Sequence, residues 1–192
     1  MKSFVKISIV VALALILGVG SALWVIHYPP VKPGVRNGAW QTNLEVGGVD
    51  ADMYLRAYIA RIGLFALNKT ETVYYHANAD SSGEPLTSNC DYRIEGESLP
   101  TRWWAITVYG EDHFLIPNPQ KRYSFNKNDV KRSENGSYSI YISRAEKDGD
   151  WIPAGEKKQR LSLTLRLYNP EPVIYEQPAK VPLPRIIEEG CR

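Results

Sequence analysis

The chain has 192 residues, and its 23 lysines and arginines nearly balance its 21 aspartates and glutamates. That length accommodates one domain with an extension, and a core large enough to fold without cross-links. The formal charge of +2 includes two lysines within the first six residues, so the remainder is almost neutral, with both signs interspersed. Binding to nucleic acid in general requires a basic stripe, so this charge pattern argues against a nucleic-acid partner.

The N-terminal region contains an apolar segment that is long enough to cross a membrane. Residues 7–26 form an uncharged run of about 20 residues, the length needed to span the hydrocarbon core of a bilayer. Lys2 and Lys6 precede this run, and Trp24 and Tyr28 mark its end, as is typical of a membrane boundary. We therefore expect a single-pass anchor with the N-terminus inside and the following domain exported to the periplasm or the cell exterior.

A cleavable signal peptide is the alternative interpretation of this segment, because Gly20 and Ala22 are the small residues that cleavage sites contain. Cleavage would yield a secreted protein. The apolar region of signal peptides is usually shorter, about 7 to 15 residues, which favours the anchor. The chain is thus divided into a transmembrane anchor or signal peptide at 1–28, a proline-rich spacer at 29–36 and one domain at 37–192.

The two cysteines of the chain, Cys90 and Cys191, are a possible disulfide. In an oxidising compartment such a bond would tie the C-terminus to the sheet. Closing a loop of about 100 residues is worth roughly 4 kcal/mol in the chain-entropy estimate. A buried thiol at Cys90 and a free thiol near the C-terminus are the alternative, because sequence does not show whether the two Cα atoms are close.

The hydrophobic pattern of the domain predicts one helix followed by several short strands. Residues 51–67 have apolar side chains at helical spacing, with Asp50 as the predicted N-cap. After it, alternation of apolar and polar residues or short apolar runs predict strands near residues 72–80, 90–95, 102–109, 114–116, 123–125, 138–142 and 161–167. Short strands separated by turn signals are typical of an antiparallel β-sandwich or jelly roll, so the fold class is mainly β with one N-terminal helix.

The strand at residues 102–109 is apolar or aromatic on both faces and contains two adjacent tryptophans, Trp103 and Trp104. Side chains alternate along a strand, so these two rings point in opposite directions. We expect this strand at the centre of a sheet, with one tryptophan in the main core and the other facing the helix or a groove. Only the second tryptophan is then able to contact a ligand.

A series of short motifs occurs in a fixed order along the exported part of the chain. The motifs are Tyr74-Tyr75, Asp80-Ser81-Ser82-Gly83-Glu84-Pro85-Leu86, Tyr92, Leu99-Pro100, Trp103-Trp104-Ala105-Ile106-Thr107-Val108-Tyr109, Leu115-Ile116-Pro117-Asn118, Arg122-Tyr123-Ser124, Asn135-Gly136-Ser137, Asp150-Trp151-Ile152-Pro153-Ala154-Gly155 and Leu165-Arg166-Leu167-Tyr168-Asn169-Pro170. This set resembles the domain of unknown function 1214, although Gly110 stands where that family usually has an aspartate after the tyrosine. The resemblance implies a β-sandwich module that is often fused to, or encoded beside, a domain of unknown function 1254, and it implies no reaction.

Sequence motifs for catalysis or metal binding are absent from the chain. There is no G-x-S-x-G nucleophile elbow and no zinc or calcium ligand spacing, so we predict no catalytic residue, no metal and no cofactor. His76 and Asp80 are four residues apart on one face of a strand, about 13 Å, which is too far for one metal ion. A solvated polar face is the better interpretation of these two residues, and aspartates beside glycine and serine usually form turns.

Aromatic side chains and one arginine are the candidate ligand-binding residues. The set comprises Trp103, Trp104, Tyr109, Tyr123, Trp151, Arg166 and Tyr168. Aromatic rings beside an arginine are able to hold a sugar, a lipid head group or an extended peptide. The alternative is that these residues are simply the core and the rim of the sandwich.

These observations favour a membrane-tethered, exported module without catalysis of its own, which binds a partner protein or a ligand in the cell envelope. A protein that carries the domain of unknown function 1254 is the expected partner. The alternative is an envelope hydrolase or lyase with an aromatic-lined cleft, in which Asp80, Asp112 or Arg166 acts. That alternative requires the three groups to converge on one concave pocket.

Overall fold

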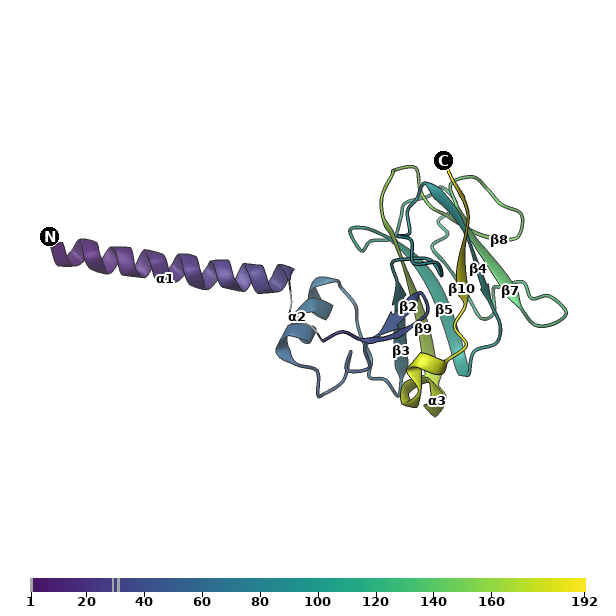
Figure 1. Cartoon of the computed structure of the whole chain (residues 1–192), viewed down its shortest axis with the longest axis horizontal. Coiled ribbons are helices and arrows are strands. Elements are labelled where there is room, and N and C mark those ends of the chain that lie inside the picture. Colours follow the sequence, from purple (N-terminus) through teal and green to yellow (C-terminus); the bar gives the residue numbers. More distant parts are fainter. Residues whose placement is uncertain (1, 29, 31) are drawn as a thin grey trace.

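The computed structural model describes residues 2–28, 30 and 32–192. Helix α1 (Lys2–His27) projects from a domain of two β-sheets (Figure 1). Its segment Ser3–His27 is long and apolar enough to cross a membrane, a property that anchors and signal sequences share. Residues 29 and 31 of the predicted spacer lie outside the described residues.

The domain consists of a larger and a smaller sheet. The larger sheet has the strand order β1-β2-β3-β9-β5-β6, and all of its neighbours are antiparallel. Its strands are β1 (Val35–Asn37), β2 (Trp40–Thr42), β3 (Thr72–Ala77), β9 (Leu161–Pro170), β5 (Thr101–Gly110) and β6 (Ser124–Asn126). The smaller sheet has the order β10-β4-β7-β8, formed by β10 (Arg185–Cys191), β4 (Cys90–Gly96), β7 (Tyr138–Ser143) and β8 (Asp150–Pro153), of which only β7 and β8 are parallel.

The main core lies between the two sheets and follows from alternation along the strands. Its large, fully buried side chains include Trp40, Tyr75, Tyr92, Ile94, Trp104, Ile106, Ile140, Ile142, Ile152, Leu163 and Leu165. Because successive side chains of a strand point to opposite faces, the residues between these positions on β3, β5 and β9 lie on the outer face of the larger sheet. The mainly β fold class with an N-terminal helix is confirmed, and the sheets pack as a sandwich.

Helix α2 (Met53–Arg61) lies on the outer side of the larger sheet and is shorter than the predicted helix at 51–67. The predicted N-cap, Asp50, was wrong. Asp52 occupies that position, and its Oδ1 accepts hydrogen bonds from the backbone N–H groups of Tyr54 (2.8 Å) and Leu55 (2.9 Å). The helix ends early because Gly63 adopts a positive φ of 69°, a left-handed conformation that terminates α-helices.

Some elements were not predicted because they carry no periodic signal. Strands β1 and β2 have three residues each, too few for alternation to show, and β10 has Ile186 as its only buried side chain. Helix α3 (Pro172–Glu176) and the 3₁₀ helix η1 (Pro178–Lys180) follow β9. The strand predicted at 114–116 was wrong, since Leu115 forms only an isolated bridge with Tyr109.

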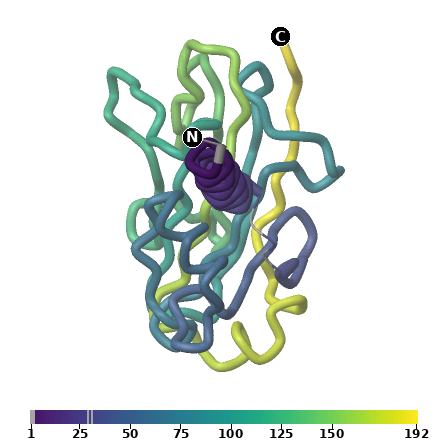
Figure 2. The backbone as a smooth tube through the Cα atoms, turned by 90° about the vertical axis from the view of Figure 1, so that its left-hand side faces the viewer, coloured from purple at the N-terminus to yellow at the C-terminus, as the bar shows by residue number. Residues whose placement is uncertain are grey.

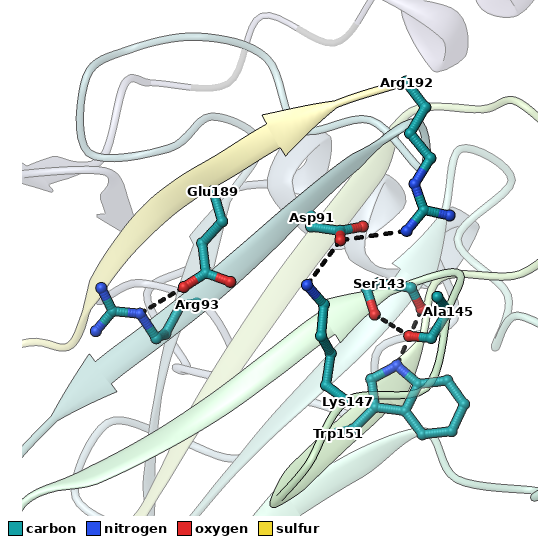
Figure 3. Close-up of polar contacts among 8 residues, drawn as sticks. All are labelled: Asp91, Arg93, Ser143, Ala145, Lys147, Trp151, Glu189 and Arg192. Carbon is teal, nitrogen blue, oxygen red and sulfur yellow. Dashed lines mark hydrogen bonds and ion pairs between the residues drawn. The ribbon is translucent and has the colours of Figure 1, made fainter.

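The C-terminal strand β10 is fastened to β4 by a covalent bond and by ion pairs. Cys90 and Cys191 are paired in register and form a disulfide that spans 101 residues of sequence. Arg93 Nε lies 2.7 Å from Glu189 Oε1, and the Arg192 guanidinium lies 3.4 Å from Asp91 Oδ2 (Figure 3). The disulfide and these ion pairs therefore hold the edge strand β10 against β4 in the smaller sheet.

The two adjacent tryptophans of β5 test the assignment of one face of the larger sheet to the core and the other face to the exterior. Trp104 is fully buried and stacks on Tyr138 with ring centroids 4.7 Å apart, whereas Trp103 is half-buried on the outer face. We expect Trp104→Ala to lower the free energy of unfolding by about 3–5 kcal/mol, because it leaves a large cavity in the core. Trp103→Ala should lower it by only about 1 kcal/mol.

Urea unfolding of the full chain in detergent, followed by circular dichroism of the domain, measures both values. Equal losses from the two substitutions would contradict the assignment of one tryptophan to each face.

Candidate functional site

A groove with a volume of about 450 Å³ lies between α2, with its flanking loops, and the outer face of the larger sheet. Figures 1 and 2 both place the segment around α2 on the side of the domain from which α1 projects. Residues from the spacer, including Pro33 and Gly34, complete one rim of the groove. The site is thus assembled from segments that are far apart in sequence.

The two walls of the groove have different chemistry. The wall formed by α2 and its flanking loops is mainly apolar, with Val46, Leu55, Tyr58, Ile59, Ile62 and Leu64. The wall formed by the sheet is polar and contributes Tyr74, His76, Asn78, Tyr109, Ser162, Thr164 and Arg166. This division follows from strand periodicity, since the leucines that alternate with the polar residues of β9 are buried in the core.

Arg166 is the principal charged group of the sheet wall. Its Nη2 donates a hydrogen bond to the Tyr109 hydroxyl (2.8 Å), and its Nη1 donates one to Thr107 Oγ1 (3.3 Å). The guanidinium carbon also lies 5.7 Å from the centre of the Tyr109 ring, within the range of a cation–π contact. The small side chain of Ala105 is opposite Arg166 in the β5–β9 register, so the arginine has room to extend along β5.

The Arg166 guanidinium has no carboxylate partner in the described part of the chain. The ion pairs there join Arg93, Lys147 and Arg192 to acidic residues of the smaller sheet, and none involves Arg166. A guanidinium has five N–H donors, and hydrogen bonds to protein atoms occupy two of them here. A half-buried arginine with free donors is well suited to bind a carboxylate or a phosphate.

His76 lies on β3, opposite Thr164 of β9, and its Nδ1 is 3.1 Å from the Thr164 hydroxyl. Burial, and after it the nearby Arg166 and His113, lower the pKa of His76 to about 4. The imidazole is therefore neutral at pH 7. The interpretation of His76 as part of a solvated polar face was wrong, because the residue is half-buried in the groove.

The groove is free of acidic side chains as far as the structure describes its lining. No aspartate or glutamate is among the described lining residues, whereas Lys32 and Arg166 contribute positive charges. A concave surface lined by one sign of charge concentrates ions of the opposite sign. The groove is accordingly complementary to an anion that also carries apolar surface.

The groove contains two of the seven candidate ligand-binding residues, Tyr109 and Arg166. Trp104 lies in the core, and Trp151 is buried in the smaller sheet, where its indole N–H donates to Ser143 O (3.1 Å, Figure 3). Both have the structural role that the alternative interpretation gave them.

The other three candidates are half-buried but do not line the groove. Trp103 and Tyr168 form an edge-to-face pair, with ring centroids 5.2 Å apart, near the β9 end that leads into α3. Tyr123 directly precedes β6, and its backbone carbonyl accepts a hydrogen bond from Val108 N. The aromatic residues therefore do not form one cluster.

The acidic candidates of the hydrolase hypothesis form turns. Burial alone would raise the pKa of Asp80, but the Ser82 hydroxyl and the backbone N–H groups of residues 82–84 donate to its carboxylate and hold that pKa below its usual value. Asp112 accepts a hydrogen bond from Phe114 N (3.0 Å). Neither carboxylate lines the groove, so Asp80, Asp112 and Arg166 do not converge on one pocket.

Other sequence motifs also have structural explanations. Asp150 Oδ2 accepts a hydrogen bond from Lys131 N (2.6 Å). Gly155 has a φ of 77°, and a Cβ atom there would lie 2.4 Å from Ile116 Cγ2. Cys90, Cys191 and Glu188 lie close together, but both sulfur atoms are in the disulfide and provide no thiolate for a metal.

Sequence reasoning did not place His76 or Lys32 in the groove; Lys32 was assigned only to the spacer. His76 alternates with the buried residues of β3, so its position on the outer face was readable from the sequence. The pairing of β3 with β9, which brings His76 close to Arg166, was not readable because 88 residues separate His76 from its partner Thr164. The apolar wall was likewise hidden, since nothing in the sequence shows which sheet face α2 covers.

Comparisons with known proteins give a family and a fold. The model of the family described as "Protein of unknown function (DUF1214)" matches residues 71–172. Among solved structures, the chain is similar to the VPA0106 protein from Vibrio parahaemolyticus, with a TM-score of 0.60 and 25% identity over 73% of this chain and 36% of that chain. No match was found among curated proteins.

A putative uncharacterized protein from Burkholderia cenocepacia is also similar, with a TM-score of 0.43 and 14% identity over 64% of this chain and 30% of that chain. The chain thus spans about a third of the length of the solved proteins it matches. The sheet wall of the groove lies within the residues that match the family, whereas α2 lies outside them.

The pKa of His76 predicts how the stability of the domain depends on pH. Between its ordinary value of 6.5 and its folded value of about 4, the unfolded chain binds a proton that the folded chain does not. Stability from this residue is complete above pH 6.5, falls as the pH decreases towards 4, and then levels off. At about 1.4 kcal/mol per pH unit, the total loss is at most about 3 to 4 kcal/mol.

Urea unfolding of the wild type and of His76→Gln across this pH range measures the effect. The wild type should lose more stability than the variant as the pH falls, and parallel curves for the two proteins would show that His76 titrates normally.

Proposed function

The chain belongs to the DUF1214 family of proteins of unknown function, and we propose that it is a membrane-tethered envelope module that binds an amphipathic anion in the groove. The observation that carries this proposal is the half-buried Arg166 guanidinium, which has free donors and no acidic partner among the described residues. Binding is favoured over the hydrolase hypothesis, because Asp80 and Asp112, the carboxylates of that hypothesis, form turns outside the groove.

The chemistry of the two walls defines the class of ligand. A carboxylate or phosphate group would accept hydrogen bonds from Arg166, whose plane is held by Tyr109 and Thr107. An acyl or similar apolar chain would lie along the wall formed by Leu55 and Ile59 of α2. The volume of about 450 Å³ is within the range typical of small-molecule sites.

The location of this module in the cell envelope rests on α1 and on the disulfide. An apolar N-terminal helix delivers the following domain to the membrane, and the lysines before it support an orientation with the N-terminus inside. A disulfide between Cys90 and Cys191 is expected of proteins in oxidising compartments outside the cytoplasm. An uncleaved α1 would keep the module at the membrane after export.

A protein partner is a second part of this proposal. The similarity to the Vibrio protein covers 36% of that chain, so in that relative a domain of this fold is joined to a longer polypeptide. We infer that the present module associates with a separate protein, and the family resemblance favours one that carries the domain of unknown function 1254. Affinity purification of the full chain from membranes of cells that express both proteins should recover the partner, and its absence would refute this association.

Substitution of the groove arginine tests ligand binding directly. The probe is octanoate, and its uncharged analogue octanol is the comparison, each titrated calorimetrically into the full chain in lipid nanodiscs. Arg166→Gln should weaken octanoate binding about 10- to 100-fold, because a charge-assisted hydrogen bond is worth about 1.5–3 kcal/mol.

The matched control is Arg160→Gln, which removes the same charge from an exposed residue just before β9 that does not line the groove. It should bind octanoate as the wild type does. Equal affinities of the wild type and Arg166→Gln, or octanol binding as tight as octanoate binding, would contradict the proposed site.

A further inference from the structure

We propose that residues 47–67, named here the α2 segment, form a second membrane contact that places the mouth of the groove at the bilayer surface. This inference rests on the proposed function in one respect, namely that α1 remains as an anchor. The α2 segment contacts the lipid of the leaflet next to the domain.

The exposed apolar side chains of the domain gather in the α2 segment. Nine large apolar side chains are exposed between residues 35 and 192, and five of them belong to this segment. They are Val49 (89% exposed), Met53 (73%), Tyr54 (41%), Phe65 (98%) and Leu67 (49%). Side chains of this size and number on one short segment indicate a surface that another apolar phase covers.

The two loops that flank α2, which carry Val49, Phe65 and Leu67, are held together as one surface. Gly47 has a φ of 74°, and a Cβ atom at that position would lie 2.1 Å from Leu67 O, so the loops before and after α2 are in direct contact. Arg56 of α2 donates from Nη2 to Val49 O (2.7 Å) and from Nε to Ala51 O (2.8 Å). The exposed apolar groups are therefore presented by a fixed arrangement of backbone.

The same segment contacts the end of α1. Arg61 Nη1 donates to Ile26 O (2.6 Å) and to His27 O (3.2 Å), the last carbonyl groups of α1. A cation at this end of a helix also interacts favourably with the helix dipole. Figure 1 shows α2 beside the C-terminal end of α1, between that end and the sheets.

The end of α1 marks the level of the membrane interface. Trp24 and Tyr28 are exposed there, and such aromatic residues favour the head-group region of a bilayer. A segment that is bound to the last carbonyl groups of α1 is at the same level. Because the α2 segment is bound to the end of the membrane anchor, we infer that its exposed apolar side chains contact lipid rather than a protein partner.

The composition of the α2 segment agrees with a shallow position in this interface. Arg56 and Arg61 are exposed on α2, as are the small apolar residues Ala57 and Ala60. The remaining N–H donors of these arginines would face the head groups while neighbouring apolar groups enter the acyl boundary. The helix has nine residues, which suits a contact that lies on the membrane rather than across it.

A contact of this kind has a consequence for ligand entry. Tyr58 and Ile62 of the segment line the groove, and so do Lys32 and Pro33 of the spacer next to α1. The groove is then bounded on one side by lipid-contacting elements. An amphipathic anion of the adjacent leaflet would reach Arg166 without passing through bulk water.

The test is the depth of a nitroxide label in vesicles that contain the full chain. Phe65→Cys is labelled at its single free thiol, with the native disulfide intact, in vesicles of phosphatidylethanolamine and phosphatidylglycerol. Glu156→Cys, in the exposed loop between β8 and β9, is the matched control. We expect the label at residue 65 to be more accessible to oxygen than to a water-soluble nickel chelate, and the label at residue 156 to show the reverse.

The outcomes distinguish failure of the membrane contact from failure of the proposed function. A label at residue 65 that is as accessible to the nickel chelate as the control overturns the membrane contact, even when octanoate still binds. If the full chain does not bind octanoate but the label at residue 65 lies in lipid, the groove ligand is refuted and the membrane contact stands. A chain that does not float with the vesicles overturns both, because each depends on the anchor.

Discussion

The pairing of β9 with β5 at the centre of the larger sheet determines both the core and the groove. One face of β9 presents Leu163, Leu165 and Leu167 to the smaller sheet, and the other presents Thr164 and Arg166 to the groove. The register with β5 then sets Arg166 opposite Ala105, close enough for its hydrogen bonds to Thr107 and Tyr109. A shift of one residue would move the leucines out of the core and the arginine into it, so the same hydrophobic constraint that folds the domain also positions its principal charged group.

The family motifs mostly report the fold. Asp80 forms a turn, Trp104 fills the core, and the motif at 150–155 supplies a buried acceptor, a buried tryptophan and a glycine in a tight approach. The groove combines two motif residues, Tyr109 and Arg166, with His76 and with apolar residues of α2 outside the family match. A ligand would therefore be determined in part by the segment that also faces α1.

The sequence predicted the elements whose burial repeats regularly. The leucines of β9 were recognisable because they are buried with a period of two, and β5 was recognisable as a strand-length run that is apolar or aromatic on both faces. The length of α2 was overestimated, because apolar residues continue at helical spacing beyond Gly63, whose left-handed backbone ends the helix. Of the candidate site, Tyr109 and Arg166 were identified, but His76 was assigned to solvent because its neighbours come from distant strands and from α2. Non-local pairing determines the site, and one sequence does not show it.

The central claim is that the groove holds an amphipathic anion through Arg166. The most direct measurement is native mass spectrometry of the full chain, purified from membranes and released from its detergent, with the wild type and Arg166→Gln prepared side by side. The account predicts that an anionic, lipid-derived species remains bound to the wild type and is strongly depleted from the variant. Equal retention of such a species by both proteins, or retention of uncharged species alone, would contradict it.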